Sequence, residues 1–275
     1  MRSPFNRAAG FATAAFLLVG IASAQADGVV SCTSADNVRL VAGDQDCFAL
    51  LSFGGDGMRA GGTLVVFLHG DVSSGGPGDA FKRIAAGLTQ PGRMTAVLIR
   101  QGYNDSEGRI STGEHYGRTD NATPANIDNI GAALDRLKQH HRAGRLVVIG
   151  HSRGSNIAGV LLGRRPGLID AAVLMSCPCD LVARQTQRGR RQGILRSLSP
   201  LEFVDRIPPE TWIATVTGAD DDNTSPQLLK AWHEALARRK LPVRDLVLAG
   251  EPHNWSPRWF EREALRALLK QAIGD

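Results

Sequence analysis

Short apolar runs alternate with segments of helical spacing along most of this chain. Thr63 to Leu68 is a continuous apolar run, and the run from Met94 to Ile99 follows it after a segment with helical spacing at residues 79–88. Strands buried on both faces of a parallel sheet are apolar throughout, whereas the helices that cover them are apolar on one side. The alternation therefore predicts an α/β protein with a mostly parallel central sheet and helices on both faces.

The same pattern places the other elements. Strands are predicted at residues 38–41, 48–53, 63–68, 94–99, 146–149, 171–175, 212–217 and 244–248, the first two as edge strands. Helices are predicted at residues 79–88, 125–140, directly after 146–149, and at about 257–272, with Thr123-Pro124 as cap and first-turn proline of the second. No internal repeat or linker divides residues 27–275, so we expect one domain there.

Residues 1–26 have the features of a secretory signal peptide. Arg2 and Arg7 make the first segment basic, Phe11 to Ile21 is apolar, and small residues precede Ala26, after which we expect cleavage. The apolar run is too short for a comfortable membrane span. The sequence therefore predicts a secreted or periplasmic protein without stable membrane insertion.

The charge of the chain is mildly basic and limits the classes of partner. The formal net charge is +5, and Arg2 and Arg7 of the expected signal peptide contribute two of these charges. No stripe of lysine and arginine with interleaved aromatic residues is present. We therefore expect no nucleic-acid partner, and the oligomeric state stays open.

Four cysteines form two pairs that differ in spacing. Cys32 and Cys47 flank a polar loop and are predicted to form a disulfide in an oxidising compartment. Only Pro178 separates Cys177 from Cys179, and we expect a bridge between them to be strained. No metal-ligand spacing accompanies them. A structural role is the prediction for this pair, and a thiol-redox role is the alternative.

The pentapeptide Gly150-His151-Ser152-Arg153-Gly154 lies between the apolar run 146–149 and a segment rich in small residues. A Gly-x-Ser-x-Gly between a strand and a helix predicts a nucleophile elbow, a sharp turn with the serine at its tip. The helix that follows directs its first N–H groups and its positive dipole end toward the serine hydroxyl. Ser152 is therefore the candidate nucleophile.

With this motif the chain resembles the α/β-hydrolase superfamily, and in particular serine esterases and peptidases such as prolyl-oligopeptidase-like and dienelactone-hydrolase-like enzymes. The resemblance extends over nearly all of residues 27–275. It implies a three-layer α/β-hydrolase fold with a short cap, and a nucleophile, an acid and a histidine in that order along the chain. It implies no cofactor and no metal.

The acid and the histidine follow from that order. Strand 212–217 leads into Gly218-Ala219-Asp220-Asp221-Asp222-Asn223, and in the family the acid lies three residues after this glycine, at Asp221. Asp220 and Asp222 are the alternatives, because one sequence does not fix the register of the turn. The last strand leads to His253, the position of the family's general base. His151, inside the elbow, is expected to support its packing.

The oxyanion donors also follow from the resemblance. His69-Gly70-Asp71 comes directly after strand 63–68 and is similar to the family's oxyanion loop. The backbone N–H groups of Asp71 and Arg153 are the predicted donors. A carboxylate beside an oxyanion would repel it. We therefore expect the Asp71 side chain to point away, or the substrate to supply a cation.

Two segments are candidates for substrate recognition. The loop at residues 100–108 either lines the cleft, with Tyr103 as the substrate-binding candidate, or only turns the chain. The segment from about residue 177 to 209 is the usual position of a lid; here it is short and basic, with Arg184, Arg188, Arg190, Arg191 and Arg196. Those arginines either form a solvated helix face or attract acidic substrates. A lipase with a long apolar lid is disfavoured.

These features predict an exported serine hydrolase that cleaves an ester, or an amide, through an acyl-enzyme. In this hypothesis His253 takes the proton of Ser152 during attack, and Asp221 holds the imidazole and stabilises its charged form. The partner is a small-molecule or peptide substrate. A serine peptidase acting on small peptides is the first alternative, and a non-catalytic binding protein on a hydrolase scaffold is the second.

Overall fold

The structure, a computed structural model, describes residues 28–72, 75–189 and 195–275, and the expected signal peptide lies outside them. The strands are β1 Leu40–Ala42, β2 Cys47–Phe53, β3 Thr63–Leu68, β4 Arg93–Leu98, β5 Arg145–His151, β6 Ala171–Met175, β7 Trp212–Gly218 and β8 Val243–Leu248. The α-helices are α1 Lys82–Gly87, α2 Pro124–His140, α3 Arg153–Arg164, α4 Leu181–Gln187, α5 Lys230–Arg238, α6 Pro257–Glu261 and α7 Glu263–Ile273. In the described part, none of them has both the length and the apolar composition needed to cross a bilayer.

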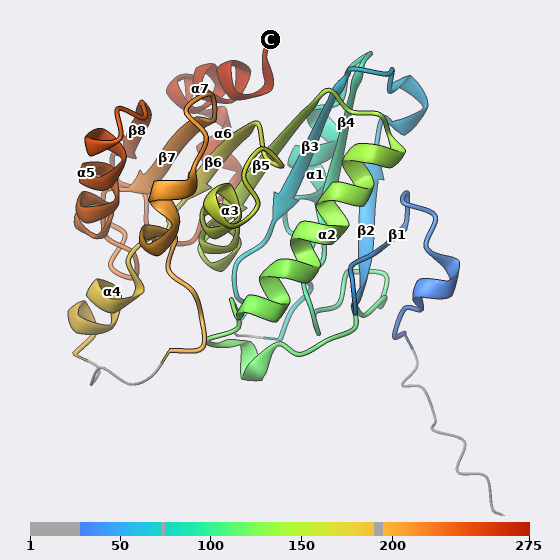
Figure 1. The fold of residues 1–275 in the computed structure, drawn as a ribbon, viewed down its shortest axis with the longest axis horizontal. Helices are drawn as coiled ribbons and strands as arrows, with labels where there is room; N and C mark the ends of the chain where they lie inside the picture. The colour runs from blue at the N-terminus through green and yellow to red at the C-terminus, as the bar shows by residue number, and fades with distance from the viewer. Residues whose placement is uncertain (1–27, 73–74, 190–194) are drawn as a thin grey trace, which may run out of the picture.

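The eight strands form one sheet in the order β1-β2-β4-β3-β5-β6-β7-β8 (Figure 1). β3 pairs in parallel with both β4 and β5, and the parallel pairing continues through β6 and β7 to β8. β1 and β2 pair antiparallel at one edge, and β2 is antiparallel to β4. The predicted α/β class with a mostly parallel sheet is confirmed. β1 is an edge strand, as predicted, but β2 is not, because it pairs with β1 on one side and with β4 on the other.

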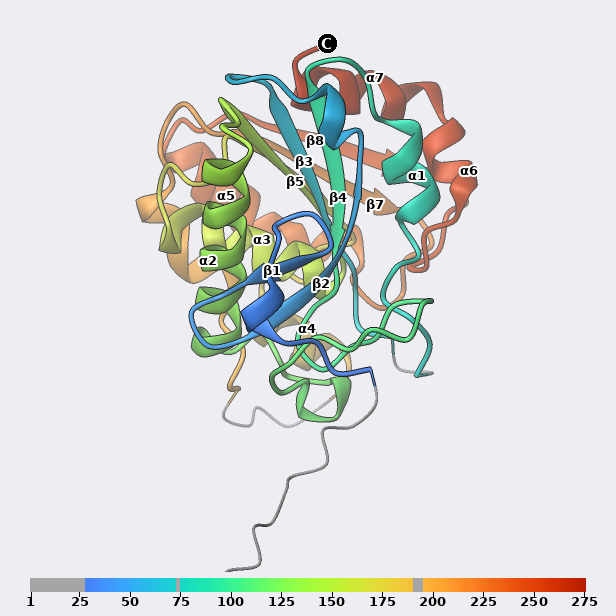
Figure 2. The ribbon, with the colours of Figure 1, turned by 90° about the vertical axis from the view of Figure 1, so that its right-hand side faces the viewer.

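Helices cover both faces of the sheet, as the two views show (Figures 1 and 2). Side chains alternate along β3: Leu64, Val66 and Leu68 belong to the core cluster shared with α2, α3 and α5. Val65 and Phe67 belong to the other cluster, which contains residues of α1, α6 and α7. Because successive side chains of a strand point to opposite faces, one apolar run supplies both cores.

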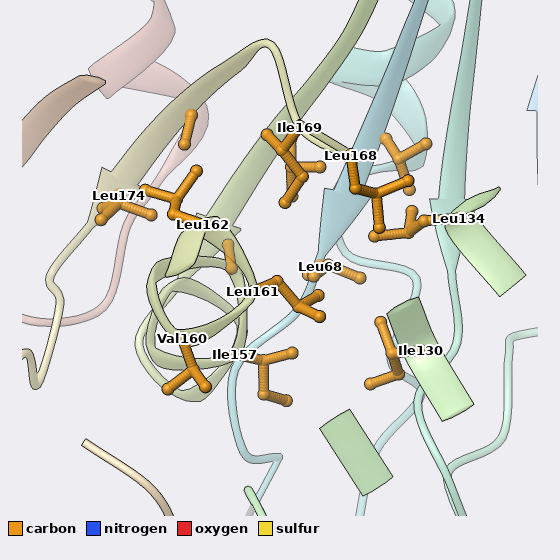
Figure 3. Packing of buried hydrophobic residues seen from close by; sticks show 14 of the residues in the cluster. Leu68, Ile130, Leu134, Ile157, Val160, Leu161, Leu162, Leu168, Ile169 and Leu174 are labelled. Carbon is orange, nitrogen blue, oxygen red and sulfur yellow. The ribbon is translucent and has the colours of Figure 1, made fainter. Parts of the chain in front are cut away.

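The helix after the elbow is packed tightly on all sides. α3 is buried from Arg153 to Gly163. Its residues Ile157 and Leu161 lie in the same apolar cluster as Ile130 and Leu134 of α2, and Figure 3 shows these side chains between the two helices and β3. This packing fixes α3, and therefore the serine that precedes it, against the sheet.

Two predicted elements are shorter than expected, for local reasons. The strand predicted at residues 38–41 begins at Leu40, because Asp36 Oδ1 accepts the N–H groups of Val38, Arg39 and Leu40. The helix predicted at residues 79–88 begins at Lys82. The carboxylate of Asp79 is instead bound by Ser106, whose hydroxyl donates to Oδ2. Side-chain bonds of this kind compete with the regular backbone pattern.

The helix predicted at 257–272 is two helices, α6 and α7. Arg262 separates them with an extended backbone (φ −64°, ψ 125°). Trp259 and Leu265 are both fully buried in the same apolar cluster. On one straight helix, residues six apart point roughly 120° away from each other. The break therefore lets both side chains enter one core.

Both cysteine pairs form disulfides. Cys32 is bonded to Cys47, as predicted, with the two Cα atoms 5.2 Å apart. Cys177 is bonded to Cys179, also with a Cα–Cα distance of 5.2 Å. The sequence predicted a structural role for this pair and a strained bridge. The bond is present, and the Cα separation lies within the range that a disulfide needs.

The order of the strands reverses at β3 and β5. The chain passes from β3 to β4 on one side, and from β5 to β6 on the other. Where connections leave neighbouring parallel strands in opposite directions, a crevice opens at the carboxyl ends of those strands. The segments at this crevice are Gly70-Asp71 after β3 and the elbow after β5.

The close approach of α3 to the 3-10 helix Pro200–Arg206 (η4) yields a stability prediction. A Cβ at Gly163 would collide with the carbonyl oxygen of Phe203 in η4. Helix propensity favours Ala over Gly, but the backbone of η4 cannot easily move aside for the added methyl group. We expect Gly163→Ala to lower the free energy of unfolding by about 1–3 kcal/mol, measured by urea denaturation.

Gly87, the last residue of α1, is the matched control. It is exposed, and a Cβ there would meet nothing within 4 Å. We expect Gly87→Ala to leave the stability unchanged or to raise it by about 0.5 kcal/mol. Equal effects of the two substitutions would contradict the packing argument.

Candidate active site

Ser152 lies at the turn between β5 and α3 with a strained backbone (φ 51°, ψ −116°). A non-glycine residue adopts such a conformation only when its surroundings enforce it. Its N–H donates to the carbonyl oxygen of Met175 at 2.8 Å. A Cβ at Gly150 would strike the backbone at Gly154 and Ser155, and one at Gly154 would strike the carbonyl of Leu68. Both glycines are therefore required by the turn.

The elbow serine is in hydrogen-bond contact with a histidine, and that histidine contacts an acid; both come from the last quarter of the chain. Ser152 Oγ lies 3.1 Å from His253 Nε2. His253 Nδ1 lies 3.0 Å from both carboxylate oxygens of Asp221. The geometry fits the tautomer in which Nδ1–H donates to Asp221 and Nε2 accepts from the serine hydroxyl. Of the three adjacent acids, Asp220 and Asp222 are exposed to solvent.

Asp221 is held by its own turn. Its Oδ1 accepts the N–H of Asn223 at 3.0 Å and that of Thr224 at 2.7 Å, and its Oδ2 accepts the Thr224 hydroxyl at 2.9 Å. Burial alone would raise the pKa of Asp221, but the bonds from His253 and Thr224 outweigh it, and the pKa lies below its ordinary value. The sequence argument did not identify Thr224. An Asx turn, in which an aspartate accepts N–H groups two and three residues later, is the signal that would have found it.

The predicted oxyanion donors Asp71 and Arg153 lie beside Ser152 in the lining of one cleft. Gly70 brings the loop after β3 close to the elbow, since a Cβ there would be 3.1 Å from Cβ of Ser152. Arg153 is the first residue of α3, and N–H groups in the first turn of a helix have no partner within the helix. The structure therefore brings both residues close to Ser152.

Two arginines of this chain balance the charge of the Asp71 carboxylate. Oδ1 is 2.8 Å from Nη2 of Arg100, and Oδ2 is 3.3 Å from Nε of Arg153. Oδ1 also accepts from Asn121 at 2.9 Å and from the Tyr103 hydroxyl at 3.1 Å. Burial would raise the pKa of Asp71, but Arg100 and Arg153 hold it well below its ordinary value. No cation from a substrate is needed.

Tyr103 differs from its predicted position. It is only 1% exposed and is not among the residues that line the cleft. Its ring packs under the guanidinium groups of Arg100 and Arg118, with centroid distances of 4.9 and 5.0 Å. Cation–π contact and the bond to Asp71 explain why this side chain turns inward. Tyr103 therefore supports the loop after β3 through Asp71 and does not lie in the cleft lining.

Two buried histidines flank the site. His69 Nε2 accepts the N–H of Arg100 at 3.0 Å, and His151 Nε2 is 2.9 Å from the carbonyl oxygen of His253. Burial, reinforced by Arg100, lowers the pKa of His69 to about 3. Burial, reinforced by His253, lowers the pKa of His151 to about 4. Both are neutral at pH 7 and act as fixed hydrogen-bonding groups.

The cleft around Ser152 has a volume of about 620 Å³. The loop that contains Arg118 and Asp120, which the sequence argument did not single out, forms one wall. The cap segment, from about residue 177 to 209, contributes Arg184 and Arg188 to another wall. Arg190 and Arg191 of this segment lie outside the described residues. In the described ranges, no group of three or more histidine, cysteine or acidic side chains is arranged to hold a metal ion.

Comparison with known proteins gives a consistent picture of the fold. A family model described as "alpha/beta hydrolase fold" matches residues 63–203, slightly more than half of the chain. An esterase of Pyrococcus furiosus superposes with a TM-score of 0.64 at 16% identity, covering 86% of this chain and 90% of that one. An acylaminoacyl peptidase of Pyrococcus horikoshii superposes with a TM-score of 0.64 at 14% identity, covering 86% of this chain and 41% of that one.

A curated relative, Protein PHYLLO, chloroplastic, of Arabidopsis thaliana, is 28% identical over 120 residues. This match covers 44% of the chain and 6% of that protein. The chain therefore corresponds to a small part of that relative.

The low pKa of His151 leads to a prediction about stability and pH. In the unfolded chain its pKa is the ordinary 6.5, and in the folded protein it is about 4. As the pH falls, His151 is therefore protonated at a higher pH in the unfolded chain than in the folded protein. The free energy of unfolding should be highest above pH 6.5 and should decrease between pH 6.5 and 4, with His151 contributing up to about 1.4 kcal/mol per pH unit.

His151→Gln keeps an N–H donor for the His253 carbonyl but removes the titration. Urea denaturation at several values between pH 6 and 4.5 should give a slope smaller than that of the wild type by about 1.4 kcal/mol per pH unit. The pH dependence that His69 contributes to the free energy of unfolding is the same in both proteins. Identical slopes would contradict the neutral, buried state of His151.

Proposed function

Since this chain belongs to the alpha/beta hydrolase fold family, we propose that it is a serine hydrolase that cleaves an ester bond through Ser152, His253 and Asp221. Membership of the family supports a hydrolase activity. The observation that carries the finer proposal is the continuous contact from Ser152 Oγ through the His253 ring to the Asp221 carboxylate, at 3.1 and 3.0 Å. These are the distances at which a proton passes from a nucleophile to a general base.

The mechanism follows from this contact. His253 Nε2 takes the serine proton as Ser152 Oγ attacks the ester carbonyl carbon, and a tetrahedral oxyanion forms. The oxyanion collapses, the bond to the alcohol breaks, and the imidazolium returns its proton to the departing oxygen. Water, deprotonated by His253, then attacks the acyl-enzyme and releases the acid and free Ser152. Asp221 stays ionised throughout and stabilises the imidazolium.

The N–H groups of Asp71 and Arg153 are proposed to bind the oxyanion. One such donor is worth roughly 3–4 kcal/mol of transition-state stabilisation in comparable sites. Two features support this assignment. The positive end of the α3 dipole lies at Arg153. The Asp71 carboxylate, which would oppose the oxyanion, is paired with Arg100 and Arg153.

A serine peptidase acting on small peptides is the alternative within the same chemistry. It uses the same three residues but must protonate a poorer leaving group, the amine. The same assay with amide substrates separates the two. If the chain is instead a non-catalytic binding protein, the folded protein should not react with a fluorophosphonate probe.

The test is the loss of the nucleophile. We expect the wild type to be labelled by a fluorophosphonate probe and to hydrolyse 4-nitrophenyl acetate. Ser152→Ala should abolish labelling and lower kcat/KM by at least about 10³-fold, because the remaining groups cannot form the acyl-enzyme. Asp221→Asn should lower it by about 10³-fold or more, because His253 loses its orienting partner.

Two exposed residues provide matched controls. Ser34→Ala should leave labelling unchanged, and Asp220→Asn should retain most of the activity, since both side chains are exposed and outside the cleft. Ester hydrolysis that persists in Ser152→Ala, or a larger loss in Asp220→Asn than in Asp221→Asn, would overturn the assignment.

We also propose that the protein is exported to an oxidising compartment. All four cysteines are in disulfides, which persist in such compartments and are rare in a reducing cytosol. The expected signal peptide leads to a specific prediction: mass spectrometry of the protein from its natural source should give an N-terminus at Asp27. Recovery of the protein with residues 1–26 still attached would contradict it.

A further inference from the structure

We infer that the cleft around Ser152 selects esters that carry a carboxylate group, an inference that rests on the proposed serine-hydrolase function. The cleft volume of about 620 Å³ is typical of a small-molecule site. Its lining is mainly polar, with Leu181 and Leu195 as the apolar side chains among the lining residues that are described. A long acyl chain would find little apolar surface there. A short, charged substrate fits the composition better.

Four arginines from three parts of the chain meet in this lining. Arg153 begins α3, Arg118 belongs to the loop before α2, and Arg184 and Arg188 belong to α4 and its end. Arginine presents a planar fork of N–H donors that matches a carboxylate. Arg153 and Arg118 have partners in Asp71 and in the Val72 carbonyl oxygen, so they act on an anion through their charge, whereas the exposed Arg188 can contact it.

The acidic residues in the same lining have partners of their own or are solvated. Asp71 is bound by Arg100 and Arg153. The two oxygens of Asp120 accept the N–H groups of Arg196 and Ser197, each at 2.9 Å. Asp222 is exposed to solvent. Asp71 and Asp120 also pair with Arg100 and Arg196, which lie outside the cleft lining, so these carboxylates offset the charge of the lining arginines only in part.

One arginine of α4 holds this helix at the cleft. Arg184 donates from Nη2 to Oδ1 of Asn223 at 2.6 Å, which ties α4 to the turn that contains Asp221. Arg188 follows four residues later, and residues four apart lie on the same side of a helix. Arg188 is exposed, and within the described ranges no carboxylate forms an ion pair with it. Its guanidinium is thus available to a substrate at the mouth of the cleft.

The geometry distinguishes this inference from general surface charge. Arg83, on α1, is an exposed arginine outside the cleft lining. If only the net positive charge attracted acidic esters, Arg83 and Arg188 would contribute equally. If the cleft binds the carboxylate, only Arg188 affects the selectivity, because charges near the surface act over about one Debye length, roughly 10 Å at 0.1 M salt.

The experiment compares acidic esters with matched neutral esters. One pair is 4-nitrophenyl hydrogen adipate and its methyl ester, which place the charge on the acyl side. The other is 3-(4-acetoxyphenyl)propanoic acid and its methyl ester, which place it on the alcohol side with nearly the same leaving group. We expect kcat/KM for the acid to exceed that for the methyl ester by about tenfold in at least one pair at low salt, and the ratio to fall at about 0.5 M salt.

The variants assign the selectivity to the cleft. Arg188→Gln should lower the acid-to-neutral ratio by up to about fivefold, and Arg184→Gln/Arg188→Gln by about tenfold, as expected of one and two partly exposed charge contacts. Arg83→Gln removes the same charge elsewhere and should leave both kcat/KM values unchanged. Thermal unfolding of each variant verifies that it is folded.

The outcomes separate this inference from the proposed function. Hydrolysis of both methyl esters at rates equal to or above those of the acids would overturn the inference and leave the serine hydrolase intact. An equal loss of the ratio in Arg83→Gln and Arg188→Gln would also overturn it. No hydrolysis of any ester, together with no fluorophosphonate labelling, would instead overturn the proposed function on which it rests.

Discussion

The backbone of Ser152 is held in a conformation that L-amino acids avoid, and the surrounding structure is organised to hold it there. Residues in such regions cost about 1–3 kcal/mol each and persist only when their neighbours enforce them. Here the Ser152 N–H is bound by Met175, its carbonyl oxygen accepts from Asn156 and Ser155, and Gly154 packs directly on Leu68. The buried helix α3 and the parallel strands β3 and β6 therefore supply the constraint together.

A second constraint is electrostatic. The loop after β3 has to approach the elbow closely, and this chain has an aspartate there. The carboxylate of Asp71 is tolerated beside Ser152 because Arg100 and Arg153 neutralise it and Tyr103 and Asn121 complete its hydrogen bonds. A buried charge without such partners would cost several kcal/mol. The loop at residues 100–108 therefore serves to place Arg100 and Tyr103 against the Asp71 carboxylate.

The candidate site also depends on the order of the strands. β3, β5, β7 and β8 all end on one side of the sheet because they run parallel, so the segments that follow them meet. Asp71, Ser152, Asp221 and His253 each come soon after one of these strands. Residues separated by about a hundred positions in sequence are within hydrogen-bond distance for this reason alone.

The sequence by itself determined the class of fold and the elbow, and the resemblance to a known family supplied the order of the three candidate residues. Apolar periodicity and glycine spacing are local properties, and a strand such as Thr63–Leu68 or the turn at Ser152 depends on little else. Side-chain bonds of Asp36 and Asp79 moved the starts of β1 and α1. Core packing around Trp259 and Leu265 divided the last helix, which periodicity did not indicate.

Only the tertiary structure decided which side chains face the cleft. It directed Tyr103 inward, paired Asp71 with Arg100, tied Thr224 to Asp221, and brought Arg118 together with Arg184 and Arg188. Each of these contacts joins groups whose spacing in sequence has no period or motif. Their partners are selected by charge, by burial and by the path of the loops, and these exist only once the sheet and its helices have packed.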